Sequence, residues 1–192
     1  MKQEDSFYMN CKPLLEANLP CFVGPRNENP TFITIHETWI EGQICQKPKM
    51  YNAEYYINQL RNPQLTSDGT LSTTGYHYLV EANKGQNSPI VYYLIPDDII
   101  THHCGSFGNK VSIGIERLVN EETDHEKSVV IQAELTAKLM FKYNIPLENV
   151  VPHKYWNPDK NCPGCLLAGL YGGWDGFIEK VAYYFGLRGE KC

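Results

Sequence analysis

Two histidines and one cysteine are the residues of this chain best suited to chemistry. His36 and His153 lie more than a hundred residues apart, and Cys162 follows His153 by nine residues, with Lys160 two residues ahead of it. Imidazole nitrogens and a thiolate are typical zinc ligands. Because three protein ligands leave one position of a tetrahedral ion for water, this set indicates a zinc hydrolase.

The spacing of Cys162 and Cys165 offers a competing interpretation. Cys162-Pro163-Gly164-Cys165 has the CxxC pattern of half a structural zinc site or of a redox pair. A closed structural site needs a second CxxC or HxxxH pair, which the sequence does not contain. A redox pair normally opens a helix beside a thioredoxin-like strand, and remains the weaker alternative. We therefore interpret Cys165 as a core or helix-start residue.

Composition narrows the class of protein. The chain has 192 residues, of which 42% are hydrophobic and 20% charged, which is typical of one sizeable globular domain. Its net charge of −5 and the lack of any Lys/Arg cluster argue against a nucleic-acid partner. No apolar stretch approaches the length of a membrane-spanning helix, so no membrane insertion is expected. Seven cysteines, an odd number, favour mostly reduced thiols and leave a single disulfide open.

Alternating and helical patterns predict the elements that position these residues. Thr31 to His36 alternates apolar and other side chains, which predicts a strand that ends at His36. Further strands are predicted over 76–82 and 90–95 as a hairpin, over 111–118, and as a short edge segment over 150–153. Helices are predicted over 50–61, 127–143 and 174–185. Glu116 falls on the strand face opposite Val111, Ile113 and Ile115.

These elements predict an α/β fold with a single domain, in which helices flank a central mixed β-sheet and the zinc site lies at one rim. Residues 1–30 contain four prolines and are expected to form an N-terminal arm packed on the domain. Residues 31–192 are expected to form the catalytic domain. Strand ends meet at the rim of a sheet, which is where His36 and His153 would be brought together.

Five motifs in order resemble one family. They are a histidine ending the first core strand (Thr34-Ile35-His36), Gly75-Tyr76-His77-Tyr78, His103-Cys104-Gly105, Ser112 to Glu116, and His153 with Lys160-x-Cys162-Pro163. In this combination, from about Thr31 to Phe185, the chain resembles the zinc-dependent N-acetylmuramoyl-L-alanine amidases of the amidase type 2, phage lysozyme and peptidoglycan-recognition-protein superfamily.

The resemblance implies a role for each candidate residue. His36, His153 and Cys162 would hold one zinc ion, and Glu116 would be the general base. Lys160 would stabilise the developing oxyanion, and Tyr76 would hydrogen-bond the zinc water or the substrate carbonyl. His103 would contact the substrate or transition state in preference to its neighbour His102. Trp39, Tyr55 and Tyr56 would line a groove for the glycan or stem peptide, with core packing of the helical aromatics as the alternative. Glu37, beside His36, is a candidate to orient that imidazole.

The implied activity is hydrolysis of the amide between N-acetylmuramic acid and the L-alanine of the stem peptide, with bacterial peptidoglycan as the partner. Cys162 favours the endolysin or autolysin type, because cytosolic amidases that recycle soluble muropeptides usually carry aspartate there. Acidic residues interrupt the first 22 residues, which predicts synthesis in the cytoplasm without a signal peptide and action on the wall after release. The alternatives are such a recycling amidase, or a non-catalytic recognition module.

Overall fold

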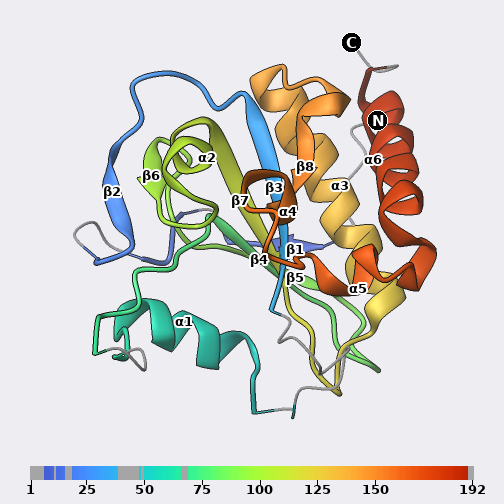
Figure 1. The fold of residues 1–192 in the computed structure, drawn as a ribbon. Coiled ribbons are helices and arrows are strands. Elements are labelled where there is room, and N and C mark those ends of the chain that lie inside the picture. Colours follow the sequence, from blue (N-terminus) through green and yellow to red (C-terminus); the bar gives the residue numbers. More distant parts are fainter. Residues whose placement is uncertain are drawn as a thin grey trace.

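A mixed sheet of six strands forms the centre of the molecule (Figure 1), in the order β1-β5-β4-β7-β3-β8. The computed structural model describes residues 7–10, 12–15, 19–38, 48, 50–65 and 69–189. The strands of this sheet are β1 (Tyr8–Met9), β3 (Phe32–Glu37), β4 (Tyr78–Glu81), β5 (Ile90–Tyr93), β7 (Ser112–Arg117) and β8 (Val150–Pro152). A separate antiparallel pair consists of β2 (Phe22–Pro25) and β6 (Ile99–Thr101).

Helices flank the sheet (Figure 1). They are α1 (Ala53–Arg61), α2 (Ser106–Val111), α3 (His125–Tyr143), α4 (His153–Trp156), α5 (Gly164–Leu167) and α6 (Gly173–Gly189), with the short 3-10 helices η1 (Leu147–Asn149) and η2 (Leu170–Gly172). Side-chain caps fix where the longer helices begin: Asn52 accepts from the Tyr55 amide and Asp124 from the Lys127 amide. Within the described residues, no helix combines the length and apolar character that crossing a bilayer requires.

The parallel strands place the predicted site at one edge. β4, β7, β3 and β8 run in parallel, so their carboxyl ends share that edge. His36 near the end of β3 lies opposite Glu116 on β7. Ile35 lies opposite Pro152, and His153 therefore follows one residue beyond the pairing. The register alone brings both histidines and the glutamate to neighbouring strand ends.

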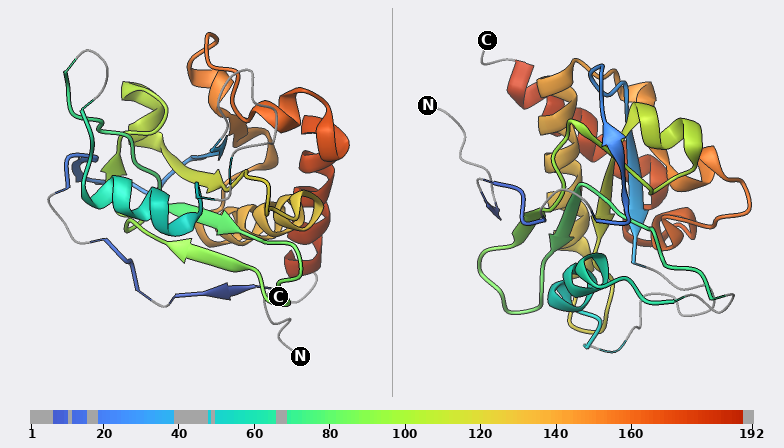
Figure 2. Two further views of the ribbon diagram at one scale, coloured as in Figure 1. Left: turned by 90° about the horizontal axis from the view of Figure 1, so that it is seen from below. Right: turned by 90° about the vertical axis from the view of Figure 1, so that its left-hand side faces the viewer.

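The two faces of β3 and β7 differ in polarity. Ile33, Ile35, Ile113 and Ile115 are fully buried in the core that α3 covers, and α6 packs against α3 on the same side of the sheet (Figure 2). Because strand side chains alternate, the other face carries Thr34, His36, Ser112, Gly114 and Glu116. Helices α2 and α4 contact these strands. The second face is therefore polar and builds the site.

Most predicted elements are confirmed. The strands over 31–36 and 111–118, the hairpin of β4 and β5, and the helices that became α1, α3 and α6 lie within a few residues of their expected bounds. The expected mixed sheet with flanking helices is confirmed as well. The described parts of the N-terminal arm contribute strands, since β1 pairs with β5 and β2 with β6. Helix α2 and strand β6 were not predicted.

A buried ion pair ties the core face of the sheet to the helices. Arg117 and Glu37 lie opposite each other on β7 and β3, and both side chains are fully buried. The Arg117 guanidinium donates to Glu37 and, over 2.9 Å, to the Ser128 hydroxyl on α3. Glu37 in turn accepts from the Cys165 amide at 2.7 Å. This pair connects two strands, α3 and α5.

Replacing Arg117 with methionine should lower the free energy of unfolding by about 3–5 kcal/mol, because Glu37 keeps a buried charge without its cation. Urea unfolding of the purified variant measures this loss. Lys142→Met is the control: its ion pair with Asp97 involves a lysine side chain that is 55% exposed, and its loss should cost under about 1 kcal/mol. Equal losses for the two variants would contradict the structural role of the Arg117–Glu37 pair.

Candidate metal centre and cleft

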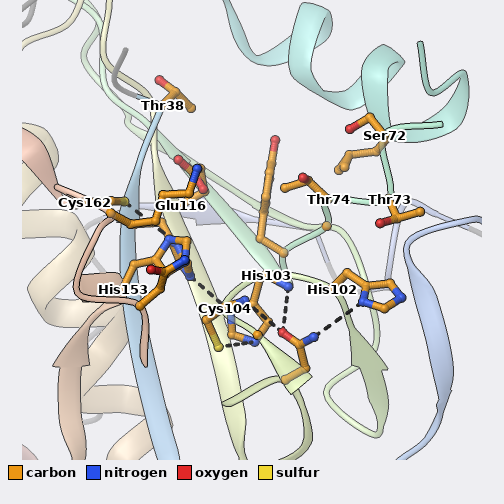
Figure 3. Close-up of a pocket in the computed structure, with 18 of the residues that line it drawn as sticks. Thr38, Ser72, Thr73, Thr74, His102, His103, Cys104, Glu116, His153 and Cys162 are labelled. Carbon is orange, nitrogen blue, oxygen red and sulfur yellow. Dashed lines mark hydrogen bonds between the residues drawn. The ribbon is translucent and has the colours of Figure 1, made fainter. Parts of the chain in front are cut away.

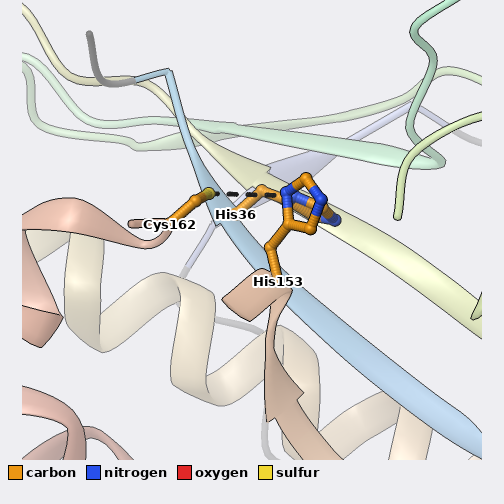
Figure 4. A group of neighbouring side chains, drawn as sticks. All are labelled: His36, His153 and Cys162. Atoms are coloured by element: carbon orange, nitrogen blue, oxygen red, sulfur yellow. Dashed lines mark hydrogen bonds between the residues drawn. The ribbon is translucent and has the colours of Figure 1, made fainter. Parts of the chain in front are cut away.

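Three side chains from distant parts of the chain converge at the carboxyl edge of the sheet. His36 comes from β3, His153 from the first residue of α4, and Cys162 from the loop before α5 (Figure 4). One ligand atom from each lies within 4.8 Å of the other two. His36 Nδ1 and Cys162 Sγ are 3.9 Å apart. Within the described part of the chain, these residues form the group suited to holding a metal ion.

The donor set and spacing fit zinc. Zinc–nitrogen bonds of about 2.0–2.1 Å and zinc–sulfur bonds of about 2.3 Å put tetrahedral ligand atoms roughly 3.5 Å apart. The 3.9 Å between His36 Nδ1 and Cys162 Sγ is close to this value, and no two of the three ligand atoms are more than 4.8 Å apart. Magnesium and calcium prefer oxygen ligands and are disfavoured by two imidazoles and a thiol.

The electrostatics of the three side chains also favour a cation between them. Burial, and then His153, lowers the pKa of His36, so its ring is neutral and offers a lone pair. Burial, and then Lys160, lowers the pKa of His153 to about 4. Burial, and then the nearby Glu116, raises the pKa of the Cys162 thiol. A bound cation is the charge that opposes this last effect and favours the thiolate.

The loop that carries Cys162 is held by backbone and side-chain contacts. The Lys154 amide donates to the Cys162 carbonyl at 3.1 Å. Glu37 anchors the next turn through the Cys165 amide, as described above. The expectation that Glu37 orients His36 is wrong, because neighbouring strand residues point to opposite faces and its carboxylate lies on the core side. Glu37 instead fixes the loop after Cys162.

The cysteines of the CxxC sequence do not pair with each other. Cys162 is free, whereas Cys165 is fully buried and disulfide-bonded. Cys165 lies in the first turn of α5, which agrees with its interpretation as a core residue at a helix start. The redox-pair alternative for Cys162 and Cys165 is therefore excluded.

A cleft of about 800 Å³ opens beside the three ligands. Figure 3 shows Cys162, His153 and Glu116 on one side and Ser72, Thr73 and Thr74 on the other. Among the residues that line the cleft are Thr38, Tyr55, Tyr56, Tyr76, His102, His103, Asn109, Lys110, Asn157 and Lys160. The walls carry hydroxyls, amides and aromatic rings, a lining suited to a polar substrate with apolar parts.

The predicted reactive residues lie together in this cleft. Glu116 is 9% exposed, and its charge contributes to the raised pKa values of both Cys162 and Tyr76. Tyr76 is 5% exposed, and within the described residues its hydroxyl has no hydrogen-bond partner. Lys160 lines the same cleft and is exposed. The carboxylate of Glu116, the hydroxyl of Tyr76 and the ammonium group of Lys160 therefore all belong to the lining of one cleft.

His102 and His103 both line the cleft, although an extended segment would let only one of them face it. His102 is half-buried, and its Nδ1 lies 3.5 Å from the Asn109 side chain. His103 is buried, and its Nδ1 lies 3.1 Å from His36 Nε2. Sequence reasoning did not anticipate this contact between His103 and a predicted zinc ligand.

Aromatic residues of α1 form part of the cleft wall. Tyr55 lines it as predicted, and its ring packs edge-on against Tyr56 with centroids 5.2 Å apart. Tyr56 also lines the cleft, as predicted. The predicted groove residue Trp39 lies outside the described residues. The Ser72–Thr74 hydroxyls were missed because Ser/Thr-rich loops carry no distinctive sequence signal.

Comparison with known sequences identifies relatives of the same type. Residues 26–165 match the family model described as N-acetylmuramoyl-L-alanine amidase. The chain is 31% identical over 157 residues to the N-acetylmuramoyl-L-alanine amidase CwlH of Bacillus subtilis (strain 168), covering 80% of this chain and 53% of CwlH. It is 32% identical over 151 residues to XlyA of the same organism, covering 77% of this chain and 43% of XlyA. The chain thus spans about half the length of these curated relatives.

Solved structures of similar sequence share the fold of this chain. A mutant endolysin from Bacillus subtilis superimposes with a TM-score of 0.71 at 28% identity, covering 91% of this chain and 99% of that one. The catalytic domain of XlyA superimposes with a TM-score of 0.68 at 30% identity, covering 86% and 94%. The family match covers both histidines, Glu116 and Cys162. This chain belongs to the N-acetylmuramoyl-L-alanine amidase family.

Proposed function

We propose that this chain is a zinc-dependent amidase domain that cleaves peptidoglycan between N-acetylmuramic acid and the L-alanine of the stem peptide, as an endolysin or autolysin does. One observation carries the proposal: His36, Glu116 and His153 lie on neighbouring strand ends, and Cys162 completes the ligand set at the same cleft. Family membership supplies the class of bond, and the similarity to a solved endolysin from Bacillus subtilis favours a wall substrate.

His36, His153 and Cys162 would hold the zinc. When bound, zinc supplies Lewis acidity, which polarises the scissile carbonyl and lowers the pKa of a coordinated water towards neutrality. All three of these side chains line the cleft, so a metal held by them would be accessible to a substrate bound there. The His36 and His153 rings also form one edge-to-face pair, with centroids 4.7 Å apart, which limits their rotation.

Glu116 would act as the proton carrier. Its carboxylate takes a proton from the attacking water, the water oxygen bonds to the carbonyl carbon, and the proton passes to the amide nitrogen as the carbon–nitrogen bond breaks. The products are a free lactyl carboxylate and a peptide with a free L-alanine amine. The near-complete burial of Glu116 keeps bulk water away from this transfer.

Lys160 and Tyr76 would stabilise the charge that develops on the carbonyl oxygen. Lys160 brings a cation to the mouth of the cleft, close enough to influence both His153 and Cys162. Tyr76 brings a buried hydroxyl that has no partner among the described residues and so retains a hydrogen bond to give. Burial and the charge of Glu116 raise the pKa of Tyr76, which keeps the hydroxyl protonated as a donor.

Tyr76→Phe should lower turnover by about 10- to 100-fold while leaving the fold as stable or more stable, by up to about 1 kcal/mol. The buried hydroxyl has lost its hydrogen bonds to water and has no partner among the described residues, so removing it should not cost stability. Turnover should fall because the hydroxyl can no longer donate a hydrogen bond to the reacting carbonyl. Thermal melts and initial rates on solubilised wall fragments measure the two effects. Tyr78→Phe is the control: its hydroxyl donates to Asp97 at 2.9 Å, so the variant should lose stability and keep its turnover when folded. Destabilisation of Tyr76→Phe would contradict the assignment.

The test of the proposed activity is product analysis. Purified bacterial peptidoglycan is digested with the zinc-loaded protein, and mass spectrometry and amine labelling identify the new ends. We expect new L-alanine amino termini and no new reducing sugar ends, with loss of activity in a chelator and recovery when zinc is added. New reducing ends would identify a glycosidase and overturn the proposal.

The same assay separates the alternatives. Activity on soluble anhydro-muropeptides but not on intact walls would identify a recycling amidase. Binding of muropeptides without cleavage by the zinc-loaded protein would identify a recognition module. The presence of Glu116, Lys160 and Tyr76 beside the ligand set favours catalysis over recognition alone.

A further inference from the structure

We propose that His103 is a positioning residue, which fixes the tautomer and orientation of His36 through a buried hydrogen-bond chain. This inference rests on the zinc site of the proposed function, although it concerns metal affinity rather than the bond cleaved. Four hydrogen-bonded residues form this connection and are called the support network: His103, Ser112, Thr34 and Trp156. Thr34 and Ser112 are fully buried, and His103 is 7% exposed.

The two ring nitrogens of His36 face different partners. Nδ1 lies 3.9 Å from Cys162 Sγ, on the side of the ligand group, and Nε2 lies 3.1 Å from His103 Nδ1. A nitrogen that binds a metal must offer its lone pair, so the hydrogen of a neutral His36 ring belongs on Nε2. From there it can be donated only to an unprotonated His103 Nδ1.

The support network imposes the same assignment from its opposite end. Trp156 Nε1 is solely a donor, and it donates to Thr34 Oγ1 at 2.9 Å. The Thr34 hydroxyl then donates to Ser112 Oγ at 2.9 Å. The Ser112 hydroxyl donates to the Gly108 carbonyl at 2.8 Å. With its hydrogen used, Ser112 can act towards His103 only as an acceptor.

That restriction fixes the proton on His103. His103 Nε2 lies 3.3 Å from Ser112 Oγ and must carry the hydrogen that it donates there. A neutral imidazole has only one N–H, so His103 Nδ1 is an acceptor. It receives the Nε2 hydrogen of His36, and His36 Nδ1 is left as a lone pair facing Cys162. The hydrogen-bond directions traced from Trp156 and those traced from the metal-binding group therefore lead to the same protonated nitrogen, Nε2, on both His36 and His103.

The neighbouring strand leaves space for this arrangement. Gly114 lies on β7, and a Cβ atom at this position would meet His103 Nδ1 at 2.7 Å and Cγ at 3.0 Å. Any larger residue would therefore push the His103 ring away from its place beside β7. Glycine at 114 is explained by this close approach rather than by an unusual backbone angle.

The support network changes the interpretation of His103. The family resemblance suggested a substrate contact, yet both His103 ring nitrogens are engaged, by His36 and by Ser112. Little of the side chain is exposed to the cleft. Its influence on the reaction therefore passes through His36. Partners that bond the second nitrogen of a metal-bound histidine typically change metal affinity by about 10- to 100-fold.

The test measures zinc affinity by competition with a chromophoric chelator. We expect His103→Leu to weaken zinc binding about 10- to 100-fold, and His103→Asn to recover most of that loss because its amide oxygen can accept from His36 Nε2. Gly114→Ala provides a second variant that displaces the ring without removing it, and should also weaken binding. His102→Leu is the matched control: it alters the adjacent, half-buried histidine of the same cleft and should keep wild-type affinity.

A spectroscopic measurement distinguishes positioning from general loss of structure. In the zinc-loaded protein, long-range nitrogen–proton NMR correlations should show His36 protonated on Nε2, with that hydrogen protected from exchange. In His103→Leu the protection should be lost, and in His103→Asn it should return. Wild-type affinity and protection in folded His103→Leu would overturn the inference alone. Failure of the wild-type protein to bind zinc would overturn the metal site itself, and loss of wall hydrolysis with zinc affinity intact would affect only the proposed function.

Discussion

Replacing Glu116 with glutamine should lower turnover on peptidoglycan by about 10²- to 10⁴-fold while the protein keeps its zinc. The amide has nearly the shape of the carboxylate but cannot accept the proton of the attacking water. Glu116 is opposite His36 in the strand register and is not one of the three ligands, so metal binding should not depend on it. Initial rates at saturating substrate, with metal analysis of the same sample, measure both quantities.

Glu148→Gln is the matched control for this variant. Glu148 is exposed on η1, outside the residues that line the cleft, so its replacement should leave turnover unchanged. A thermal melt of each variant establishes that the fold is intact. Near-wild-type turnover in folded, zinc-loaded Glu116→Gln would show that another group carries the proton.

Replacing Cys162 with alanine should remove both the zinc and the activity. Two imidazoles alone lack the thiolate charge that would balance the cation, and they leave the ion with too few protein ligands to survive dialysis. The loop itself should persist, because the Cys162 carbonyl and the Cys165 amide, rather than the thiol, make its anchoring bonds. Elemental analysis after dialysis against a weak chelator measures the loss.

Cys21→Ala is the control for the Cys162 variant. Cys21 is also a free and buried thiol, yet it packs in the second apolar cluster with residues of α1 rather than among the ligands. Its loss should reduce stability through a small cavity and leave zinc content at the wild-type level. Full zinc content in Cys162→Ala would contradict the ligand assignment.

The site was largely predictable because short-range patterns and a family resemblance pointed to the same residues. The alternation of residues 31–36 and 111–118 identified two strands, and it placed Glu116 on the face that proved to carry the cleft. The conjunction of His153 with Cys162 across a Pro- and Asn-rich loop pointed to two of the three side chains that converge at the candidate metal centre. What the pattern could not supply was the register that sets Glu116 opposite His36, because strand pairing is a long-range property.

The elements that were missed depend on tertiary contacts. Ser106–Val111 has a glycine in the middle of only six residues, which is a weak helix signal. Gly108 is nevertheless required there: a Cβ atom would meet Cys104 Sγ at 2.6 Å and the Trp156 ring at 2.8 Å. The small strands β1 and β2 form in a proline-rich stretch because partner strands offer hydrogen bonds. Hydrogen bonds to a strand that is distant in sequence are not reflected in the local β-propensity of the residues.

The side chains of Glu37 and His103 show where adjacency in sequence misleads. Glu37 follows His36 directly, but the period of two in a strand sends its carboxylate to the core, where it pairs with Arg117. His103 lies far from His36 in the sequence, yet its ring contacts the His36 imidazole. The partner of a buried imidazole is set by the packing of strands and could not be deduced from spacing.

Anomalous diffraction from crystals of the zinc-loaded protein, collected on both sides of the zinc absorption edge, tests the central claim most directly. We predict one strong peak per chain, within bonding distance of His36 Nδ1, a ring nitrogen of His153 and Cys162 Sγ. A peak at any other group of side chains, or no peak in crystals of protein that cleaves peptidoglycan, would contradict the zinc site on which the proposed reaction depends.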